Sequence, residues 1–281
     1  MPVPDYAADY FVWDVSPELF SIGPIVIRWY GLLFACGFLF GFQLMGWIYK
    51  REGKPVQDLD RLFIYMVLGT VIGARLGHCL FYHPSYYLTH PLEILMVWHG
   101  GLASHGATIG ILLALYLYCR KAKDQPYLWL VSRMTLIVAL AAIFIRIGNF
   151  FNSEIIGIPS DLPWAVLFVR NHEFGAIVPR HPAQLYESFA YFWIFIILML
   201  TYIKCGKDTQ PELLLGLFFT LVFSARYLIE FVKTIQSGFE NSMTLHMGQL
   251  LSLPLILFGL YMLFLAYRNR KKSSHAAVTK K

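Results

Sequence analysis

The sequence predicts an all-α polytopic membrane protein with seven transmembrane helices. Of its 281 residues, 57% are hydrophobic and 14% are charged, which is more apolar and less charged than an ordinary soluble domain. Crossing roughly 30 Å of hydrocarbon at about 1.5 Å per residue takes about twenty apolar residues. Such stretches occur at about 23–48, 60–81, 92–118, 127–147, 183–203, 211–232 and 247–267.

Lysine and arginine residues orient these spans, because short loops rich in them stay in the cytoplasm. Basic residues follow the first, third, fifth and seventh spans, beginning at Lys50, Arg120, Lys204 and Arg268. The N-terminal tail carries acidic residues and no basic residue before Arg28. We therefore expect the N-terminus to lie outside and the C-terminus to lie in the cytoplasm.

A single membrane domain, 1–281, is the simplest organisation, because no internal repeat or low-complexity linker is evident. Within it, segment 148–182 is rich in proline and glycine, and we expect it to form a small periplasmic cap. Residues 268–281 form a basic cytoplasmic tail. The net charge of +6 is accounted for by this tail and the cytoplasmic loops, so nucleic-acid binding is not indicated. Four scattered cysteines without a Cys-x-x-Cys pair indicate neither a disulfide framework nor a metal site.

Polar side chains from five spans fall at a similar depth, in the outer third of the membrane. Counting 1.5 Å per residue from the span ends places Tyr30, Arg75, His105, Arg146 and Arg226 there. An arginine in a bilayer costs roughly 2.5 to 3.5 kcal/mol even on lenient scales, so it generally faces a cavity, a partner or an anion. We interpret the five residues as the lining of a polar chamber open to the outer leaflet.

The chemistry of these groups indicates a phosphate ligand. Arginine forks match phosphate oxygens, and histidine is the usual group for proton transfer near neutral pH. Glycine-rich backbone near the start of the third span, at Gly100 and Gly101, can offer amide donors to an anion. A phosphate ester whose acyl chains stay in the bilayer is a phospholipid, which is therefore the predicted ligand.

Simpler interpretations exist for single residues. Arginines near helix ends can snorkel to the interface, and Arg226 with Glu230 at i, i+4 can form an intrahelical pair. The glycines, including Gly106, can simply permit close helix packing. Arg75 and His78, three residues apart, receive no assignment from the sequence.

The chain resembles the phosphatidylglycerol:prolipoprotein diacylglyceryl transferase family along nearly the whole membrane part. Four stretches carry the resemblance, and they are Arg28 to Gly31, Gly100 to Gly106, Arg146 to Phe150 through Gly157, and His181 to Glu187. Arg226 to Phe231 and Met247 to Gln249 through Pro254 add two more. The family commonly has glycine where this chain has Ala107 and Ser153, which argues against close backbone approach to a ligand at those two points.

The resemblance implies transfer of the diacylglyceryl group from phosphatidylglycerol to the lipobox cysteine thiol of a preprolipoprotein signal peptide. A thioether forms and glycerol phosphate leaves, with no metal or organic cofactor required. The resemblance also places the enzyme in the bacterial inner (plasma) membrane as a multi-pass protein, with its active site toward the periplasm. The implied catalytic residues are His105, Arg226, Arg146 and Tyr30, with Arg146 and Arg226 on the head group and His105 serving the thiol. Substrate-binding roles fall to Arg146, Asn149, Glu154, Gly157, Glu230 and Gly101. Whether His105 is the general base stays open at this point.

A membrane transporter or channel for an anionic or lipid substrate is the alternative function, because spans with buried arginines also describe an anion path. The charged groups stop in the outer third, however, whereas a permeation path needs polar groups that continue to the cytoplasmic side. An intramembrane protease is disfavoured because Ser104 and His105 are adjacent and point roughly 100° apart on a helix.

Overall fold

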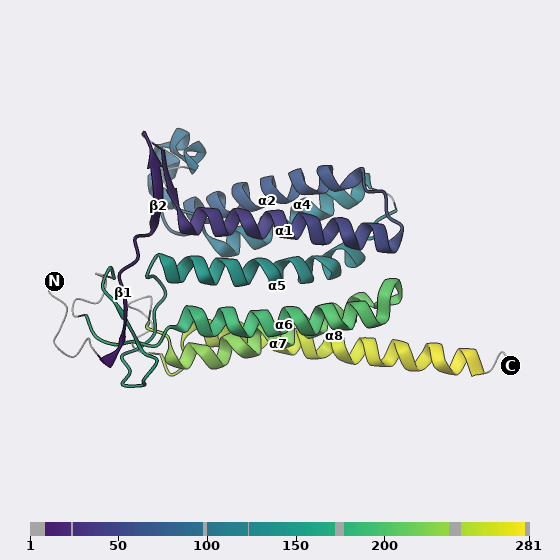
Figure 1. Ribbon diagram of the computed structural model, residues 1–281. Helices are drawn as coiled ribbons and strands as arrows, with labels where there is room; N and C mark the ends of the chain where they lie inside the picture. Colours follow the sequence, from purple (N-terminus) through teal and green to yellow (C-terminus); the bar gives the residue numbers. More distant parts are fainter. Residues whose placement is uncertain are drawn as a thin grey trace. The chain divides into compact units, whose positions relative to one another are not determined.

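The computed structural model describes residues 9–23, 25–97, 100–122, 124–171, 177–235 and 243–278, and long helices dominate it (Figure 1). The α-helices are α1 (Trp29–Glu52), α2 (Asp58–Phe81), α3 (Pro84–Thr89), α4 (Ser104–Lys121), α5 (Tyr127–Phe151), α6 (Ala183–Cys205), α7 (Pro211–Ile229) and α8 (Met247–Val278). Short 3-10 turns are η2 (Pro91–Leu95), η4 (Gly206–Asp208) and η5 (Glu230–Val232). The strands are β1 (Phe11–Trp13), β2 (Glu18–Ile22), β3 (Ile25–Arg28) and β4 (Val166–Phe168).

Six of the helices in the described part of the chain are long and apolar enough to cross a membrane, namely α1, α2, α5, α6, α7 and α8. The prediction of a helical, polytopic membrane protein is therefore confirmed. The predicted start of the third span was wrong, because residues 91–95 form η2 and α4 begins only at Ser104. Gly100 and Gly101 have φ angles of 83° and 68°, so the chain turns there instead of continuing as a helix.

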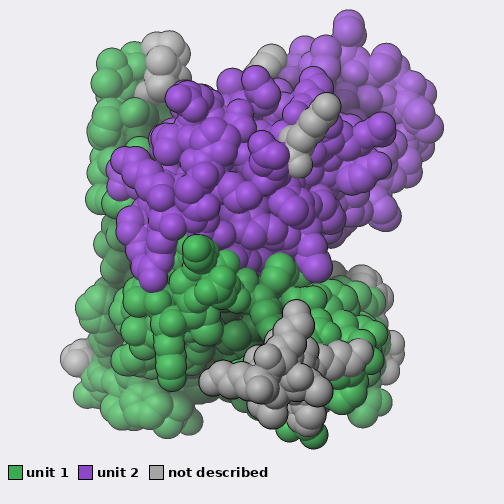
Figure 2. All heavy atoms as spheres, turned by 90° about the vertical axis from the view of Figure 1, so that its right-hand side faces the viewer, with its two compact units in different colours: residues 1–41, 135–281 green, residues 42–134 purple. Residues whose placement is uncertain are grey.

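The contacts of the chain define two compact units (Figure 2). Unit 1 comprises residues 1–41 and 135–281, and unit 2 comprises residues 42–134. The boundaries fall inside α1 and α5, so each of these helices contributes a segment to both units. The two units are described separately.

Small residues bring the helices of unit 1 close together. An added Cβ at Gly41 of α1 would lie 2.6 Å from Ile137 Cγ2 of α5. Between α7 and α8, a Cβ at Gly216 would lie 2.7 Å from Leu263 Cγ, and one at Gly259 would lie 2.5 Å from Thr220 Oγ1. Such close approach is how transmembrane helices gain packing energy without a hydrophobic driving force between them.

Short strand pairings, which the sequence did not predict, join one end of the unit 1 helices. β1 runs parallel to β4 with Trp13 opposite Phe168, and β2 and β3 form an antiparallel pair. Single bridges link Val166 to Arg180 and Gly157 to Lys233. Buried side chains of Phe150, Ile156, Val166 and Phe168 form a small core under these strands, with Trp13 packed against it. Much of segment 148–182 is thereby ordered together with the N-terminal tail.

In unit 2, α2 and α4 pack through facing glycines. A Cβ at Gly73 would lie 2.5 Å from the carbonyl oxygen of Gly106, and one at Gly77 would lie 2.6 Å from Gly106 Cα. Gly69 and Gly110 meet in the same way one turn further along. The packing interpretation of Gly106 is therefore confirmed.

A buried polar network lies at the other end of unit 2. Arg133 Nε and Glu52 Oε1 are 3.0 Å apart, with both side chains almost fully buried. Trp129 Nε1 donates to the same carboxylate at 2.6 Å, and the Tyr118 hydroxyl donates to Gln125 Oε1 at 2.9 Å. These bonds join the ends of helices that are far apart in the sequence.

Candidate active site

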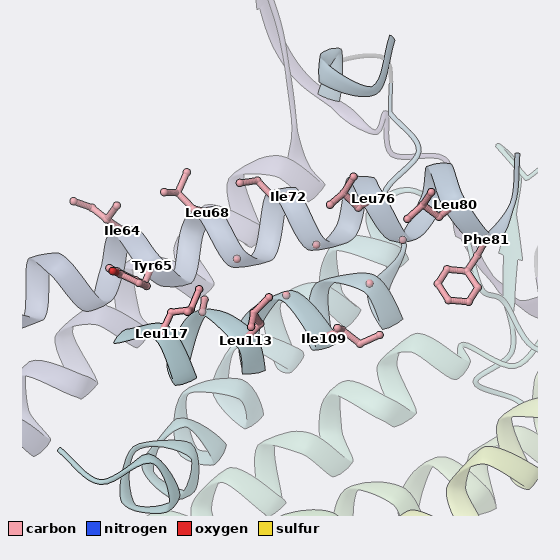
Figure 3. A pocket seen from close by; sticks show the side chains of 16 residues that line it. Ile64, Tyr65, Leu68, Ile72, Leu76, Leu80, Phe81, Ile109, Leu113 and Leu117 are labelled. Atoms are coloured by element: carbon pink, nitrogen blue, oxygen red, sulfur yellow. The ribbon is translucent and has the colours of Figure 1, made fainter. Parts of the chain in front are cut away.

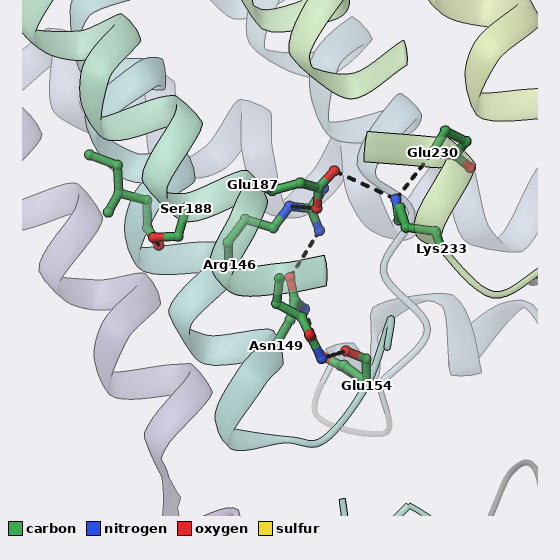
Figure 4. Close-up of polar contacts among 9 residues, drawn as sticks. Arg146, Asn149, Glu154, Glu187, Ser188, Glu230 and Lys233 are labelled. Carbon is green, nitrogen blue, oxygen red and sulfur yellow. Dashed lines mark hydrogen bonds and ion pairs between the residues drawn. The ribbon is translucent and has the colours of Figure 1, made fainter. Parts of the chain in front are cut away.

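Arg146, on the last turns of α5, is held by groups on two helices of unit 1. Its Nε lies 2.7 Å from Oε2 of Glu187 on α6, and its Nη1 donates to Oδ1 of Asn149 at 3.0 Å (Figure 4). It is also hydrogen-bonded to Tyr191, one helical turn beyond Glu187. The Arg146 side chain is 15% exposed and the Glu187 side chain is 0% exposed. The guanidinium is thus fixed in orientation while part of it still reaches the surface of the cluster.

Glu187 also contacts a second cation. Its Oε1 lies 3.5 Å from Lys233 Nζ, and that ammonium lies 3.2 Å from Oε2 of Glu230 (Figure 4). Lys233 is placed there by its own backbone, because the segment after η5 bridges Gly157 and Thr234 N–H donates to the Ile156 carbonyl at 3.1 Å. The structure thereby joins the ends of α5, α6 and α7 through one line of alternating charges.

Asn149 extends this line to Glu154. Its Nδ2 donates to Glu154 Oε1 at 2.6 Å, so one amide bridges the arginine and the carboxylate (Figure 4). Glu154 is brought back over the end of α5 by a tight turn in which Ser153 and Ile155 have φ angles of 54° and 58°. The Gln184 side chain secures this turn by donating to the Glu154 carbonyl at 2.6 Å.

Gly157 lies where three chain segments meet. Its N–H donates to the His181 carbonyl at 2.9 Å, and an added Cβ would lie 2.5 Å from His181 Cβ and 2.6 Å from the Val232 carbonyl. Only glycine fits between these backbones. The contact explains the residue type at 157 as packing that positions Lys233.

His181 belongs to a hydrogen-bonded series beside Gly157. Trp164 Nε1 donates to Tyr186 Oη at 2.8 Å, and Tyr186 Oη lies 3.1 Å from His181 Nδ1. Because the indole can only donate, the tyrosine hydroxyl keeps its own proton to donate to Nδ1 when the ring proton of His181 is on Nε2. Burial lowers the pKa of His181 below its ordinary value. The neutral imidazole is therefore the favoured form.

Tyr30 and Arg226 border the same cluster. Gly148 lets Tyr30 lie against α5, since a Cβ there would be 2.8 Å from Tyr30 Cδ2. Tyr30 interacts electrostatically with Arg146 and Glu154, and Arg226 interacts electrostatically with Tyr191. Glu230 pairs with Lys233, and this is the ion pair the structure shows for it in place of the intrahelical pair with Arg226 that the sequence allowed.

The cluster carries balanced charge. Arg146, Arg226 and Lys233 are matched by Glu154, Glu187 and Glu230. Ions taken out of water are tolerated when they are paired and hydrogen-bonded. The site is therefore a preformed ion network that presents a fixed guanidinium.

His105 and Gly101 lie in unit 2. His105 is the second residue of α4, its side chain is exposed, and its ring packs edge-on against Phe81 with the centroids 5.0 Å apart. An added Cβ at Gly101 would lie 2.5 Å from the His78 ring. Among the predicted site residues, the structure brings together Tyr30, Arg146, Asn149, Glu154, Gly157, Arg226 and Glu230 in unit 1.

Arg75, which the sequence left unassigned, has a structural role. Its side chain is buried, and it donates to the carbonyls of Glu93 at 2.5 Å, Ile94 at 3.0 Å and Gly100 at 2.6 Å. The guanidinium also lies over the Tyr87 ring at 5.1 Å. Arg75 therefore anchors the chain between α3 and α4 onto α2, and its donors are occupied by backbone.

Comparison with known proteins shows which family the chain belongs to. The family model for prolipoprotein diacylglyceryl transferase matches residues 17–265. The chain belongs to the prolipoprotein diacylglyceryl transferase family. It is 53% identical over 92% of its length to the phosphatidylglycerol–prolipoprotein diacylglyceryl transferase of Chloroherpeton thalassium, covering 94% of that protein. The enzymes of that name from Tolumonas auensis and Bacteroides fragilis are 47% and 42% identical, over 92% and 93% of this chain and 99% and 96% of theirs.

Membership of this transferase family decides against the transport alternative. Ser153 is one residue before Glu154 in the turn after α5. Ser153 is buried, adopts a left-handed φ of 54° and leaves its hydroxyl without a hydrogen-bond partner among the described residues. The turn that carries Glu154 therefore has a backbone conformation at 153 that glycine would adopt more readily than serine.

Glu187 and Lys233 have no role in the site predicted from the sequence, although both belong to the transferase's ion network. The signal for Glu187 was available, since an ionised carboxylate a few residues inside an apolar span indicates a buried partner. Lys233 gave no such signal, because it directly follows a predicted span, where a basic residue in a loop is common. Its burial depends on the pairing of residues 232–234 with 156–158.

In the described part of the chain, no three His, Cys, Asp or Glu side chains are gathered as a metal site would require.

Proposed function

We propose that the ion network around Arg146 holds the phosphate of phosphatidylglycerol. The enzyme transfers the diacylglyceryl group of this lipid to prolipoprotein, a step of lipoprotein maturation, as its family membership gives. In the proposed reaction the thiolate of the lipobox cysteine attacks the glycerol carbon. A carbon–sulfur bond forms, the carbon–oxygen bond to the phosphate breaks, and glycerol phosphate leaves with the electron pair.

The observation that carries this proposal is the fixed guanidinium of Arg146. Glu187, Asn149 and Tyr191 engage only part of its five N–H donors, so the rest can bind phosphate oxygens in a set orientation. Charge that develops on the leaving phosphate is best stabilised by donors that need no reorganisation. Arg226 interacts electrostatically with Tyr191 and is proposed to share this role.

The remaining roles follow the family resemblance. We assign His105 to the cysteine thiol, whose ordinary pKa of about 8.5 leaves most of it protonated at neutral pH without a base. Tyr30, Asn149, Glu154, Gly157 and Glu230 are assigned to the substrate site, directly or by positioning Arg146 and Lys233, and Gly101 is assigned to it from unit 2. No role in the proposal requires a metal or an organic cofactor.

We also propose the finer topology. α4 serves as a seventh span, the N-terminus lies outside and the basic tail from 268 lies in the cytoplasm, as the lysine and arginine distribution supports. Segment 148–182 then forms a periplasmic cap on a single membrane domain. The enzyme is accordingly placed in the bacterial inner membrane with its active site toward the periplasm, where the lipid enters sideways from the outer leaflet.

A reconstituted assay tests the head-group role. Wild type, Arg146→Ala, Arg146→Lys and Ser188→Ala are placed in phosphatidylglycerol nanodiscs with a lipobox peptide, and mass spectrometry reads the diacylglyceryl adduct. Ser188 is a matched control, because it is a buried neighbour of Glu187 that donates to the Ile143 carbonyl at 3.3 Å. We expect no product from Arg146→Ala, little from Arg146→Lys, and normal product from Ser188→Ala. Normal turnover by a folded Arg146→Ala protein would overturn the proposal.

A further inference from the structure

Unit 2 carries an apolar trough along the seam between α2 and α4 (Figure 3). Its volume is about 580 Å³. One wall is a row of exposed aliphatic side chains on α2, spaced four residues apart, and the other is a similar row on α4. These rows are Ile64, Leu68, Ile72, Leu76 and Leu80 on α2, and Ile109, Leu113 and Leu117 on α4. Glycines of both helices form the floor.

The two rows have the geometry of helix ridges. Side chains four residues apart align along a helix and form the ridges that interdigitate when helices pack. Because the glycines bring the two backbones into contact, the two rows project on either side of a floor made mostly of glycine backbone, with Ala114 and Tyr65 toward one end. The trough is therefore shaped to take a further ridge of side chains from a third helix.

The α2 wall of the trough is about as long as the apolar helix of a signal peptide, and the α4 row from Ile109 to Leu117 rises about 12 Å beside it. From Ile64 to Leu80 the α2 ridge rises about 24 Å, whereas one leaflet of a bilayer core is about 15 Å deep. An acyl chain from one leaflet would fill only part of it. The apolar core of a signal peptide has about 7 to 15 residues, which as a helix reaches about 22 Å at most.

The trough ends at a residue assigned to the reaction. Phe81 lines its last turn, and the same ring packs edge-on against His105. A helix lying in the trough with its C-terminal end at Phe81 would place the residues that follow it beside the imidazole. In a prolipoprotein the cysteine to be modified follows the apolar segment of the signal peptide.

We propose that the α2–α4 trough seats the apolar signal helix of the prolipoprotein and delivers its cysteine to His105. This inference rests on the proposed role of His105. It adds a docking surface for the protein substrate that is separate from the Arg146 cluster assigned to the lipid head group. In this proposal the aliphatic rows of α2 and α4 select the protein substrate, because only a signal helix of matching length and shape packs against them.

Photo-crosslinking tests the occupant directly. Benzoylphenylalanine is placed at Ile72 or Leu113 on the ridges, or at Leu257 on α8 as a control at a similar number of residues from its helix end. The full-length enzyme in nanodiscs is irradiated with a peptide that carries a complete signal segment. The proposal is supported if the peptide crosslinks to positions 72 and 113 but not to position 257. These crosslinks should disappear when unlabelled peptide is added. Adducts to lipid alone, or between two copies of the enzyme, overturn it.

Filling the trough gives an independent kinetic test. Ile72→Trp and Leu113→Trp are compared with Leu257→Trp, using a full signal peptide and a short peptide that keeps the cysteine but lacks the apolar segment. We expect KM for the full peptide to rise about tenfold, equivalent to about 1.4 kcal/mol of lost binding, with KM for the short peptide unchanged. Equal losses with both peptides, or no change with either, would refute signal-helix docking. If the wild-type enzyme modified neither peptide, the assigned reaction itself would be wrong.

Discussion

One buried carboxylate, Glu187, holds two cations at once. Its Oε2 lies 2.7 Å from Arg146 Nε and its Oε1 lies 3.5 Å from Lys233 Nζ. Each cation is in turn bound to a second acceptor, Asn149 for the arginine and Glu230 for the lysine. The orientation of the Arg146 guanidinium, which we propose to bind the lipid phosphate, therefore depends on residues that the lipid itself need not touch.

Glu187→Gln should cost both stability and transfer activity. The substitution keeps the shape of the side chain but leaves two buried cations short of a counter-charge, and breaking a buried ion pair generally costs about 3 to 5 kcal/mol. Thermal unfolding and initial transfer rates at limiting phosphatidylglycerol measure the two effects, with Ser188→Ala as the control. Adding Lys233→Gln should recover part of the stability by removing one unpaired cation. If Glu187→Gln had the wild-type unfolding midpoint and transfer rate, the ion pairs of Glu187 would contribute to neither stability nor activity.

Ser153→Gly should stabilise the protein. A left-handed conformation costs a non-glycine residue about 1 to 2 kcal/mol, and the buried hydroxyl lacks a partner among the described residues. Greater freedom of glycine in the unfolded chain offsets part of this gain, by about 0.5 to 1 kcal/mol. We expect a higher unfolding midpoint with transfer activity retained. Ile155→Gly relieves a similar φ of 58° but loses a half-buried apolar side chain, so it should gain less. A lower midpoint for Ser153→Gly would contradict the argument.

The sequence predicts what depends on local composition, and it fails where distant segments meet. Apolar runs of about twenty residues located six membrane helices, and the spacing of Arg146 and Asn149 on one helix placed them together. The parallel pairing of Phe11–Trp13 with Val166–Phe168 joins segments about 150 residues apart, and no local pattern announces it. The apolar run at about 92–118 extends beyond the start of α4, because the positive φ angles at Gly100 and Gly101 that break the chain there are a tertiary outcome. Lys233 was missed for the same kind of reason.

Gly248→Ala should impair the enzyme by displacing Glu230. An added Cβ at this first turn of α8 would lie 2.5 Å from Glu230 Cδ, so the carboxylate has to move. Lys233 then loses its 3.2 Å partner, and Glu187 is left to hold the lysine alone. We expect a reduced transfer rate with insertion in the membrane preserved, measured beside Leu251→Ala, an exposed neighbour on the same helix. Equal activity of both variants would remove Gly248 from a positioning role.

Acidification should weaken the fold through His181. Burial lowers its pKa below the ordinary value of 6.5, so the unfolded chain takes up a proton before the folded protein does. The stability contributed by the neutral ring is complete above about pH 6.5 and is lost as pH falls from there through the lower folded-state pKa. Unfolding midpoints at pH 7.5 and 5.5 should therefore differ more for wild type than for His181→Gln, whose amide oxygen can still accept from Tyr186. Identical pH slopes would show that His181 does not titrate in this range.

Arg75→Lys should loosen the approach to α4 even though the charge is kept. The planar guanidinium reaches the carbonyls of Glu93, Ile94 and Gly100 at once, and a single ammonium on a flexible stem lacks that fork geometry. A fully buried carbonyl left without a donor costs about 1 to 3 kcal/mol, and the half-buried carbonyls of Glu93 and Ile94 should cost part of that. We expect a lower unfolding midpoint and faster limited proteolysis between α2 and α4. Arg61→Lys, on the exposed start of α2, is the matched control and should leave both unchanged.

Because Gly100 precedes the helix that carries His105, a loosened anchor should also lower kcat more than it raises KM for phosphatidylglycerol. An Arg75→Lys enzyme with wild-type proteolysis and kcat would mean that the backbone of this segment holds itself in place.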